Sequence, residues 1–314
     1  MTTEEAVRLL RSILYNVERV IVGKRYAIEL TINALACGGH VLIEDVPGVG
    51  KTSLAAALAK SLACSFRRIQ FTPDIMPSDI TGFSVYDPRS GEFVFKPGAI
   101  ITQFLLADEI NRTSPKTQSS LLEAMEEQQV TVDGRSYPVP SPFMVIATQN
   151  PVEYLGTFAL PEAQLDRFFM KITLGYPQAS EESKILSRFQ ESEPLKELGP
   201  VTGAENIIEL QNAVGGVYMD RSLKDYIVAI VRYTRNQEEV TLGASPRGSL
   251  NLFRSAQAWA LYQRREYVIP DDIIAMAPHV LEHRLRLKQE AKLRRITALD
   301  IINRALTQVE KPKI

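Results

Sequence analysis

Apolar residues recur along the chain with two different periods, which predict where helices and strands form. Residues 4–20 carry apolar side chains three and four positions apart, as does the stretch 26–36 that ends at Gly38-Gly39, so both predict helices. Helical patterns also cover 52–62 and 115–127. Five short apolar runs are typical of buried strands: residues 40–44, 68–71, 101–107, 143–148 and 168–174. Strands alternating with helices predict an α/β domain with a parallel five-stranded sheet covered on both faces.

Two segments interrupt this alternation of strands and helices. In residues 83–95, the turn Asp87-Pro88-Arg89-Ser90-Gly91 separates two short alternating runs. In residues 130–139, Asp133-Gly134 lies between alternating residues. Each segment predicts a β-hairpin inserted into the α/β domain.

From Gly175-Tyr176-Pro177 onward the pattern is helical only. Polar residues and prolines mark the predicted helix starts: Ser180, Thr202, Asp220, Ser245 with Pro246, Pro270, and Thr297 with Asp300. The helix that follows Asp220 is expected to run to about Arg235. We therefore predict two domains, an α/β domain over residues 1–175 and a smaller all-helical domain over 176–314.

Composition narrows the class of protein. The 314 residues are 45% hydrophobic and 23% charged with a formal net charge of −1, which is ordinary for a globular protein and excludes collagen, disorder and a disulfide scaffold. The balanced charge argues against coating DNA or an anionic membrane, and it presents little electrostatic obstacle to self-association. Cys37 and Cys64 form no CxxC pair, which favours free thiols, and the longest uncharged run, 136–152, holds four prolines. These features predict a cytoplasmic protein without a membrane span.

The strongest local signal for chemistry is HVLIEDVPGVGKTSLAAAL, residues 40–58. An apolar strand, a glycine-rich turn and Lys-Thr at the start of a helix together form the context of a phosphate-binding loop. Lys51 would neutralise the β- and γ-phosphate oxygens, and the Thr52 hydroxyl would ligate Mg²⁺. The strict motif has glycine where this chain has Asp45. The predicted binding loop comprises Pro47, Gly48, Val49, Gly50, Lys51, Thr52 and Ser53.

Two further strands end in polar residues. The run FLLADEINR ends its apolar part at Asp108-Glu109, where the first acid would hold the Mg²⁺ shell and the second would polarise the attacking water. The run FMVIATQNP ends in Asn150, which could orient that water or contact the γ-phosphate. The carboxyl ends of parallel strands are where open α/β sheets bind ligands.

Two arginines complete the candidate set. Arg167, in LPEAQLDRFF, stands immediately before the fifth strand, and Arg247, in GASPRGSL, lies in the first turn of a predicted helix. Arginine at a helix N-terminus is unfavourable toward the helix dipole, so Arg247 suggests an anionic partner. Nucleoside triphosphate hydrolysis is accelerated when an arginine neutralises charge in the transition state.

The order and spacing of PGVGKT, LLADEINR, ATQNP, LDRF and ASPR resemble an AAA+ ATPase, and more narrowly the MoxR family. The resemblance matches Lys51 and Thr52 to Walker A and Asp108 and Glu109 to Walker B. It further matches Asn150 to sensor 1, Arg167 to the arginine finger and Arg247 to sensor 2. Val22 and Gly23 fall where such proteins contact adenine, and the two hairpins fit the helix-2 insert and the pre-sensor-1 hairpin.

The resemblance also implies a mechanism. Such proteins bind ATP or ADP with Mg²⁺ between the protomers of a ring, typically a hexamer. Arg167 would reach the γ-phosphate of the next subunit, Arg247 would report the nucleotide state to the helical lid, and Arg112 is a further candidate for facing the neighbour. The hairpins would point to the pore or face of the ring. Family members resemble chaperones that mature, activate or load metal into client proteins, often ones with a von Willebrand factor A-type domain.

Two other readings remain open at this stage. Minichromosome maintenance helicases share the hairpin insertions, but residues 130–139 offer only Arg135 opposite Asp133, too little charge to grip phosphates. The basic stretch 283–295 is interrupted by Glu290 and favours a solvated face. The third reading, a scaffold that binds ATP without hydrolysing it, is disfavoured by Glu109. No GxGxxG follows the first strand, which excludes a Rossmann dehydrogenase.

Overall fold

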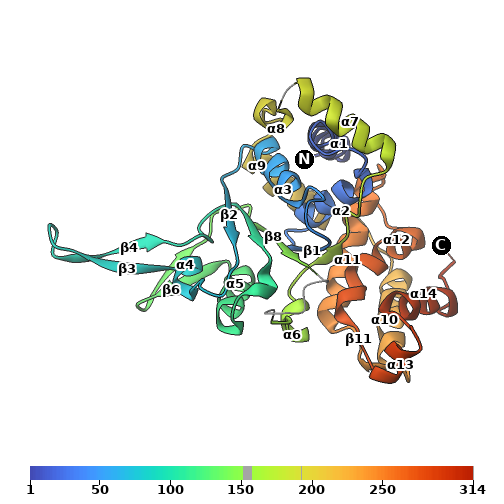
Figure 1. Cartoon of the computed structure of the whole chain (residues 1–314). Coiled ribbons are helices and arrows are strands. Elements are labelled where there is room, and N and C mark those ends of the chain that lie inside the picture. The colour runs from blue at the N-terminus through green and yellow to red at the C-terminus, as the bar shows by residue number, and fades with distance from the viewer. Residues whose placement is uncertain (151–157, 192, 314) are drawn as a thin grey trace.

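The computed structural model describes residues 1–150, 158–191 and 193–313 and shows an α/β domain followed by a mainly helical region (Figure 1). The α/β domain is built on a parallel five-stranded sheet with the strand order β2-β5-β8-β1-β9. All five predicted strands are confirmed. Their bounds are β1 Val41–Glu44, β2 Phe66–Gln70, β5 Phe104–Asp108, β8 Met144–Gln149 and β9 Met170–Ile172.

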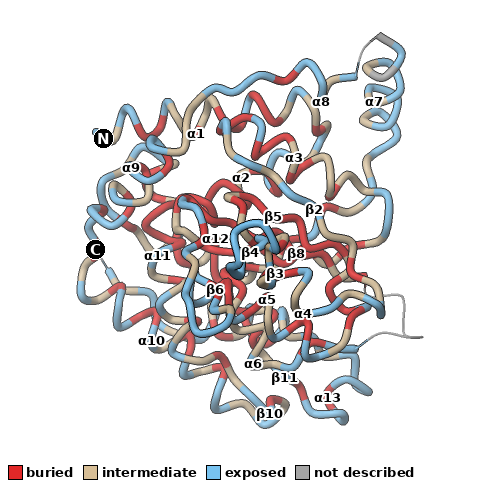
Figure 2. Tube along the Cα trace, turned by 90° about the vertical axis from the view of Figure 1, so that its left-hand side faces the viewer, coloured by how far each residue is buried: buried red, intermediate tan, exposed pale blue. Residues whose placement is uncertain are grey.

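The sheet is covered on both faces because successive residues of each strand point to opposite sides. In β1, Val41 and Ile43 belong to one apolar cluster, whereas Leu42 belongs to the cluster on the other face. In Figure 2 the strands β5 and β8 lie at the buried centre of the domain. The helices of the domain are α1 Thr3–Glu18, α2 Arg25–Ala36, α3 Lys51–Ser61, α4 Pro77–Thr81, α5 Pro115–Glu127 and α6 Glu162–Leu165, with the short 3₁₀ helix η1 Ile110–Arg112.

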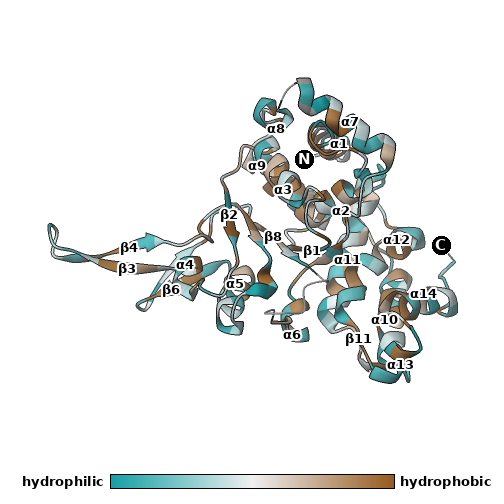
Figure 3. Cartoon of the chain, in the orientation of Figure 1, coloured by the Kyte–Doolittle hydropathy of each residue, from teal (hydrophilic) through white to brown (hydrophobic). Residues whose placement is uncertain are grey.

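Both predicted hairpins are present. β3 Gly82–Asp87 pairs with β4 Glu92–Pro97, and β6 Gln129–Val132 pairs with β7 Arg135–Pro138. The β3–β4 hairpin projects away from the rest of the molecule (Figure 1), although hydrophobic residues occur along it (Figure 3). At its base, the ring of Phe95 stacks on that of Tyr137 with centroids 3.8 Å apart, which joins the two hairpins.

The remaining helices follow the predicted starts closely. Asp220, Ser245 and Thr297 cap their helices with side-chain oxygens, and Thr297 and Asp300 form the predicted capping box. The helix after Asp220 ends at Arg235, as expected. The bounds are α7 Ala179–Glu191, α8 Pro194–Glu197, α9 Ala204–Gly215, α10 Arg221–Arg235, α11 Pro246–Tyr262, α12 Pro270–Leu281, η2 Glu282–Arg284, α13 Gln289–Leu293 and α14 Ala298–Gln308.

Three local predictions in this part were wrong. The expectation of helices alone after residue 175 misses an antiparallel ribbon of β10 Val240–Leu242 and β11 Arg286–Leu287, strands too short to show an alternating pattern. Ser180 is no cap, because α7 already begins at Ala179. Thr202 is no cap either, since its hydroxyl accepts a hydrogen bond from the Asn206 side chain and Gly203 takes the cap position.

Helices α7 and α8 pack on the α/β domain. The Arg188 guanidinium on α7 donates to the carbonyls of Glu18 and Arg19 at the end of α1, over 3.0 and 2.8 Å. The Lys60 ammonium on α3 donates to the carbonyls of Leu195 and Lys196. A boundary near residue 175 stays a prediction. Within the described residues, none of the helices has the length and apolar character needed to span a bilayer.

Candidate functional site

The predicted phosphate loop lies between the carboxyl end of β1 and the N-terminus of α3. Gly48 and Gly50 have φ angles of +84° and +93°, in the left-handed region that side chains disfavour. No atom lies within 4 Å of where a Cβ would be at either glycine, so backbone conformation is the reason for glycine here. The Lys51 side chain is buried, and its ammonium donates to the Asp45 carbonyl over 2.8 Å. The loop is thus already folded around its lysine.

The departure from the loop motif at Asp45 has a structural reason. One carboxylate oxygen of this buried residue accepts from the Val46 N–H over 2.8 Å. The other accepts from the backbone N–H groups of Leu174 and Gly175, over 2.7 and 2.6 Å. Asp45 therefore ties the start of the phosphate loop to the chain leaving β9, a role that glycine could not fill.

Asp108 and Glu109 lie at the carboxyl end of β5, beside Thr148 of β8. The Thr148 hydroxyl donates to one Asp108 carboxylate oxygen over 2.5 Å and accepts from the Glu109 N–H over 2.9 Å. Arg68 of β2 holds the other Asp108 oxygen at 2.7 Å. These three strands are neighbours in the sheet, so parallel pairing brings the groups together. Sequence reasoning missed both Arg68 and Thr148, although each lies in or at the end of a predicted strand.

Glu109 adopts a strained backbone conformation. Its φ and ψ of +56° and +50° are left-handed, which costs a non-glycine residue about 1–3 kcal/mol and is common at functional sites. Its carboxylate lies 3.2 Å from the Arg112 guanidinium. Arg112 thus contacts the acid of its own chain, and a role toward a neighbouring subunit stays a prediction.

Asn150 lies at the same edge of the sheet. It is buried and follows β8 directly, between the ends of β5 and β1. Lys51, Thr52, Asp108, Glu109 and Asn150 are therefore gathered at the carboxyl edge, as predicted from the strand ends.

A cavity of about 460 Å³ opens beside the phosphate loop. Its volume is within the range of small-molecule sites. The loop contributes Gly48, Val49, Gly50 and Ser53, and the apolar side includes Val22, Pro177, Ile185 and Leu195. Gly23 does not line this cavity. A Cβ at Gly23, whose φ is +74°, would lie 2.0 Å from the Glu181 carboxyl carbon, so glycine permits α7 to approach.

The described residues offer limited ligands for a metal ion. They contain no group of three or more His, Cys, Asp or Glu side chains arranged to hold one. Thr52 and Asp108 instead supply oxygen atoms, the donor type that Mg²⁺ prefers alongside substrate phosphates. The donor set therefore fits Mg²⁺ that arrives with a nucleotide.

Arg167 and Arg247 lie elsewhere, at the amino edge of the sheet. They line a second cavity, of about 340 Å³, together with Gly38, Gly39 and His40, which precede β1, and Phe169, which precedes β9. From His40 to Asp45 the strand spans about 16 Å at roughly 3.3 Å per residue. The predicted site is thus divided between two edges. A role for Arg247 toward the nucleotide of its own chain does not fit this placement.

One carboxylate holds both arginines. The Arg167 guanidinium lies 3.1 Å from one Glu126 oxygen, and the Arg247 guanidinium contacts the other. The anionic partner expected for Arg247 is therefore, within this chain, Glu126 at the end of α5. Arg254 lines the same cavity from the same face of α11. Sequence reasoning missed Arg254, although its spacing of seven from Arg247 predicts a shared helix face.

The expectation of a solvated basic face at 283–295 was wrong for Arg284. This residue ends η2 and is buried, with its Nε 3.0 Å from an Asp166 oxygen. Asp166 is the residue before Arg167. The composition of the segment does not show that the side chain of Arg284 points inward, to the boundary between the α/β domain and the helical region.

Comparison with known proteins identifies the family of the chain. Residues 40–170 match the model of the ATPase family associated with various cellular activities, and residues 232–305 match that of the AAA lid domain. The chain is 53% identical to the uncharacterized protein YeaC of Bacillus subtilis, with 98% of this chain and 97% of YeaC covered. It is 42% identical to Chaperone MoxR1 of Mycobacterium tuberculosis, with 98% and 84% covered.

Two further relatives bear on the family and the fold. Protein MoxR of Methylorubrum extorquens is 31% identical, with 94% of this chain and 93% of that protein covered. The crystal structure of a candidate ATPase from Cytophaga hutchinsonii superposes with a TM-score of 0.92 at 38% identity, covering 99% of this chain and 97% of that one. With a phosphate loop, paired acids and a following lid in one chain, these similarities lead to one conclusion: the protein belongs to the MoxR family of AAA+ ATPases.

Proposed function

We propose that this protein hydrolyses ATP to ADP and phosphate in a Mg²⁺-dependent reaction at sites shared between neighbouring subunits of a ring, and uses the cycle to remodel client proteins. The observation that carries this proposal is the division of the site. The phosphate loop and acids lie at the carboxyl edge of the sheet, whereas Arg167 and Arg247 lie at the amino edge. Two copies must meet for one complete site.

At the carboxyl edge, each side chain has a distinct task. The loop N–H groups and Lys51 bind the β- and γ-phosphates, and Glu109 accepts a proton from the attacking water. Asn150 orients that water. Thr52 and Asp108 would hold Mg²⁺, which neutralises phosphate charge when bound. Val22 and the apolar wall of the cavity face the adenine, and Gly23 lets α7 close over it.

At the amino edge, Arg167 and Arg247 supply positive charge to the nucleotide of the next subunit. Arginines delivered in this way stabilise the transition state of phosphoryl transfer, typically by about 10³–10⁵ in rate. Three guanidinium groups face one carboxylate in this cavity, so its net charge suits an anion. A ring, with six subunits as the expected number, satisfies every such interface.

The β3–β4 hairpin is the proposed contact for client proteins. Phe83, Tyr86 and Phe93 are exposed on it, with Phe93 70% exposed. Exposed aromatic side chains favour contact with apolar protein segments. The name of Chaperone MoxR1 agrees with a protein-directed role. Clients with a von Willebrand factor A-type domain, and metal loading of a client, remain the finer parts of this proposal.

The translocase alternative has little support at the second hairpin. Arg135 lies opposite Val132 in the β6–β7 pair and next to the acidic turn at Asp133. Salt-sensitive binding of single-stranded DNA would be the result that favours it.

The decisive experiment mixes two inactive variants. Glu109→Gln should bind ATP but lose at least about 10² in turnover, because its general base is gone. Arg167→Ala should also be inactive, because it supplies no charge to its neighbour. In equimolar mixed rings, about a quarter of the interfaces combine an intact Glu109 with an intact Arg167, so hydrolysis should return to roughly that fraction of wild type.

The matched control is the mixture of Arg167→Ala with Arg247→Ala, in which neither subunit supplies an intact pair of arginines. This mixture should stay inactive. If the Glu109→Gln mixture also stays inactive while both variants assemble, the shared site is refuted.

A further inference from the structure

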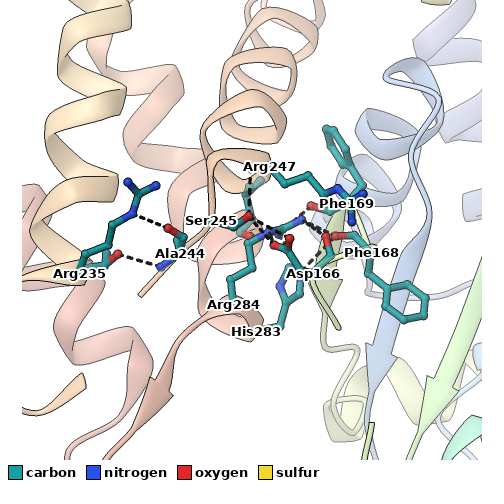
Figure 4. Close-up of polar contacts among 11 residues, drawn as sticks. Asp166, Phe168, Phe169, Arg235, Ala244, Ser245, Arg247, His283 and Arg284 are labelled. Carbon is teal, nitrogen blue, oxygen red and sulfur yellow. Dashed lines mark hydrogen bonds and ion pairs between the residues drawn. The ribbon is translucent and has the colours of Figure 1, made fainter. Parts of the chain in front are cut away.

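A polar cluster, in which His283 and Arg284 are buried and the other two residues partly buried, joins the two parts of the molecule beside the arginines. It consists of Asp166, Ser245, His283 and Arg284, and we call it the Asp166 cluster (Figure 4). The Asp166 carboxylate accepts from the Ser245 hydroxyl over 2.9 and 3.0 Å and from the Arg284 Nε over 3.0 Å. Asp166 belongs to the α/β domain, whereas the other three residues come from the helical region.

The cluster satisfies a buried guanidinium almost completely. The Arg284 side chain is 1% exposed. Besides Asp166, it donates to the carbonyls of Phe168, Phe169 and Val280. Burial lowers the pKa of Arg284 to about 10, and the charge of Asp166 opposes that shift, so the group is charged at neutral pH. A buried charge without such partners would be strongly unfavourable.

The cluster is attached directly to both arginines of the amino edge. Asp166 is the residue before Arg167. Ser245 caps α11, and its hydroxyl oxygen accepts from the Arg247 N–H over 3.1 Å. One carboxylate therefore belongs to the residue before Arg167 in the α/β domain and is linked through Ser245 to the backbone of Arg247 in the helical region, and Figure 4 shows this second link.

We infer that Asp166, Ser245 and Arg284 are positioning residues that hold Arg167 and Arg247 as a single two-arginine unit for the triphosphate of the neighbouring subunit. This inference rests on the proposed shared site. Glu126 already bridges the two guanidinium groups with its two carboxylate oxygens. The pair is thus spaced to receive two oxygens of one anionic group. Two cations from different domains keep that spacing only if the domain boundary between them is fixed.

If the cluster residues have a purely structural role, replacing one should destabilise the whole fold. If they have a positioning role, replacing one should impair only the arginines that the subunit supplies to its neighbour. Complementation separates the two. Asp166→Asn should lower kcat at least about tenfold and leave the affinity of its own phosphate loop for a fluorescent ATP analogue within about twofold, because that loop lies at the other edge. Mixed rings with Glu109→Gln should recover activity, and mixed rings with Arg167→Ala should not.

Ser245→Ala provides a second variant that leaves the Asp166–Arg284 ion pair in place. We expect the same complementation pattern with a smaller loss of kcat, and Ser245→Thr, which keeps a capping hydroxyl, should retain activity. Thr297→Ala is the matched control. It removes a hydroxyl cap from α14, away from the amino edge, and should leave kcat unchanged.

The outcomes separate this inference from the function beneath it. If Glu109→Gln does not restore the ATPase activity of Arg167→Ala in mixed rings, the shared site is refuted, and the positioning role is refuted with it. If Arg167→Ala is rescued but Asp166→Asn is fully active, or is rescued equally by Arg167→Ala, only the positioning role is overturned. An equal loss of kcat in Ser245→Thr and Ser245→Ala would also overturn it.

Discussion

The two edges of the central sheet are built in contrasting ways. At the carboxyl edge, the phosphate loop, the paired acids and Asn150 each follow a strand directly, and neighbouring strands bring them together. At the amino edge, the cavity combines the end of α5, the chain before β9 and the first turns of α11. The polar groups of the carboxyl edge are therefore positioned by the sheet, whereas the arginines of the amino edge depend on how the helical region docks.

This difference has a functional consequence. The phosphate loop, the paired acids and Asn150 all come from one chain, so each subunit carries this half of the proposed site without a partner. A cavity that depends on docking responds to any movement of the helical region, because Arg247 moves with α11 while Arg167 stays with the sheet. Under the proposed shared site, the amino edge is thus the better place for a signal between subunits, since its two arginines would act together only when the docking is intact.

The largest expected effect tests whether Arg247 belongs to the amino edge in function as well as in position. Arg247→Ala should lower kcat by about 100-fold, as for loss of one transition-state donor, with little change in ATP affinity. Mixing with Glu109→Gln should restore hydrolysis. Arg232→Ala, an exposed arginine on α10, is the control and should be neutral. Weaker ATP binding without rescue would instead assign Arg247 to its own nucleotide.

The second prediction concerns pH, because His40 and His283 are both buried at the amino edge. The His40 ring contacts the Met125 carbonyl through Nε2, and its Nδ1 accepts a hydrogen bond from the Val145 N–H. Protonation at Nδ1 would place two N–H donors opposite each other and break that hydrogen bond. Burial lowers the pKa of His40 to about 4, and burial also lowers the pKa of His283.

The unfolded chain binds a proton at this histidine below about pH 6.5, whereas the folded chain does not until about pH 4. The free energy of unfolding should therefore fall as the pH drops from about 6.5 to 4, by up to about 3 kcal/mol for His40. Urea unfolding at several pH values checks this. His40→Gln should flatten the slope, and parallel curves for the two proteins would contradict it.

The sequence predicts the carboxyl edge better than the amino edge, because the groups of the carboxyl edge follow strands directly. The sequence could place three residues at the carboxyl edge: Lys51, Asp108 and Asn150. A buried apolar run ends at or near Asp108 and Asn150 and before the loop that carries Lys51, and the carboxyl ends of parallel strands lie at the same edge of the sheet. Thr148 could not be recognised as the bridge between the acids, since a threonine inside an apolar strand carries no distinct signal. The resemblance suggested Val22 and Gly23 as adenine contacts, and this stays a prediction: Val22 lines the cavity beside the loop, whereas Gly23 lies close to Glu181 of α7.

At the amino edge the sequence supplied candidates but not their grouping. Arg167 and Arg247 were chosen for their motifs, yet nothing local shows that Glu126 holds both. Arg284 was assigned to a solvated face because Glu290 interrupts the basic run of its segment. Only the docking of η2 against the chain before β9 reveals its burial. Contacts between segments that are distant in the sequence are set by tertiary packing. Neither the hydrophobic periodicity nor a local motif predicts such contacts.

The third prediction sharpens the comparison at the carboxyl edge. Asp45→Gly would make the loop match the strict motif but would leave the N–H groups of Leu174 and Gly175 without their acceptor. We expect a loss of about 1–3 kcal/mol in the free energy of unfolding, together with weaker ATP binding. Asp45→Asn should fall between Asp45→Gly and wild type, because one oxygen remains. Unfolding in urea and nucleotide titration measure both. Equal stability for the glycine variant would show that the motif, rather than the tie to β9, governs this position.

The smallest expected effect is at Glu126, whose carboxylate contacts both arginines within the chain and, under the proposed function, would be displaced by the phosphate of a neighbouring subunit's nucleotide. Its contacts with Arg167 and Arg247 are partly exposed, so Glu126→Gln should change the free energy of unfolding by less than about 1 kcal/mol. The neutral amide competes less with phosphate, so subunits should associate more tightly in ATP, by about twofold to fivefold. Glu123→Gln on the same helix is the matched control, and sedimentation at varied protein concentration is the measurement. Weaker association and lower hydrolysis in Glu126→Gln would mean that Glu126 helps to orient the arginines instead of competing for them. The function of the amino edge would then depend on α5 as well as on the chain before β9 and on α11.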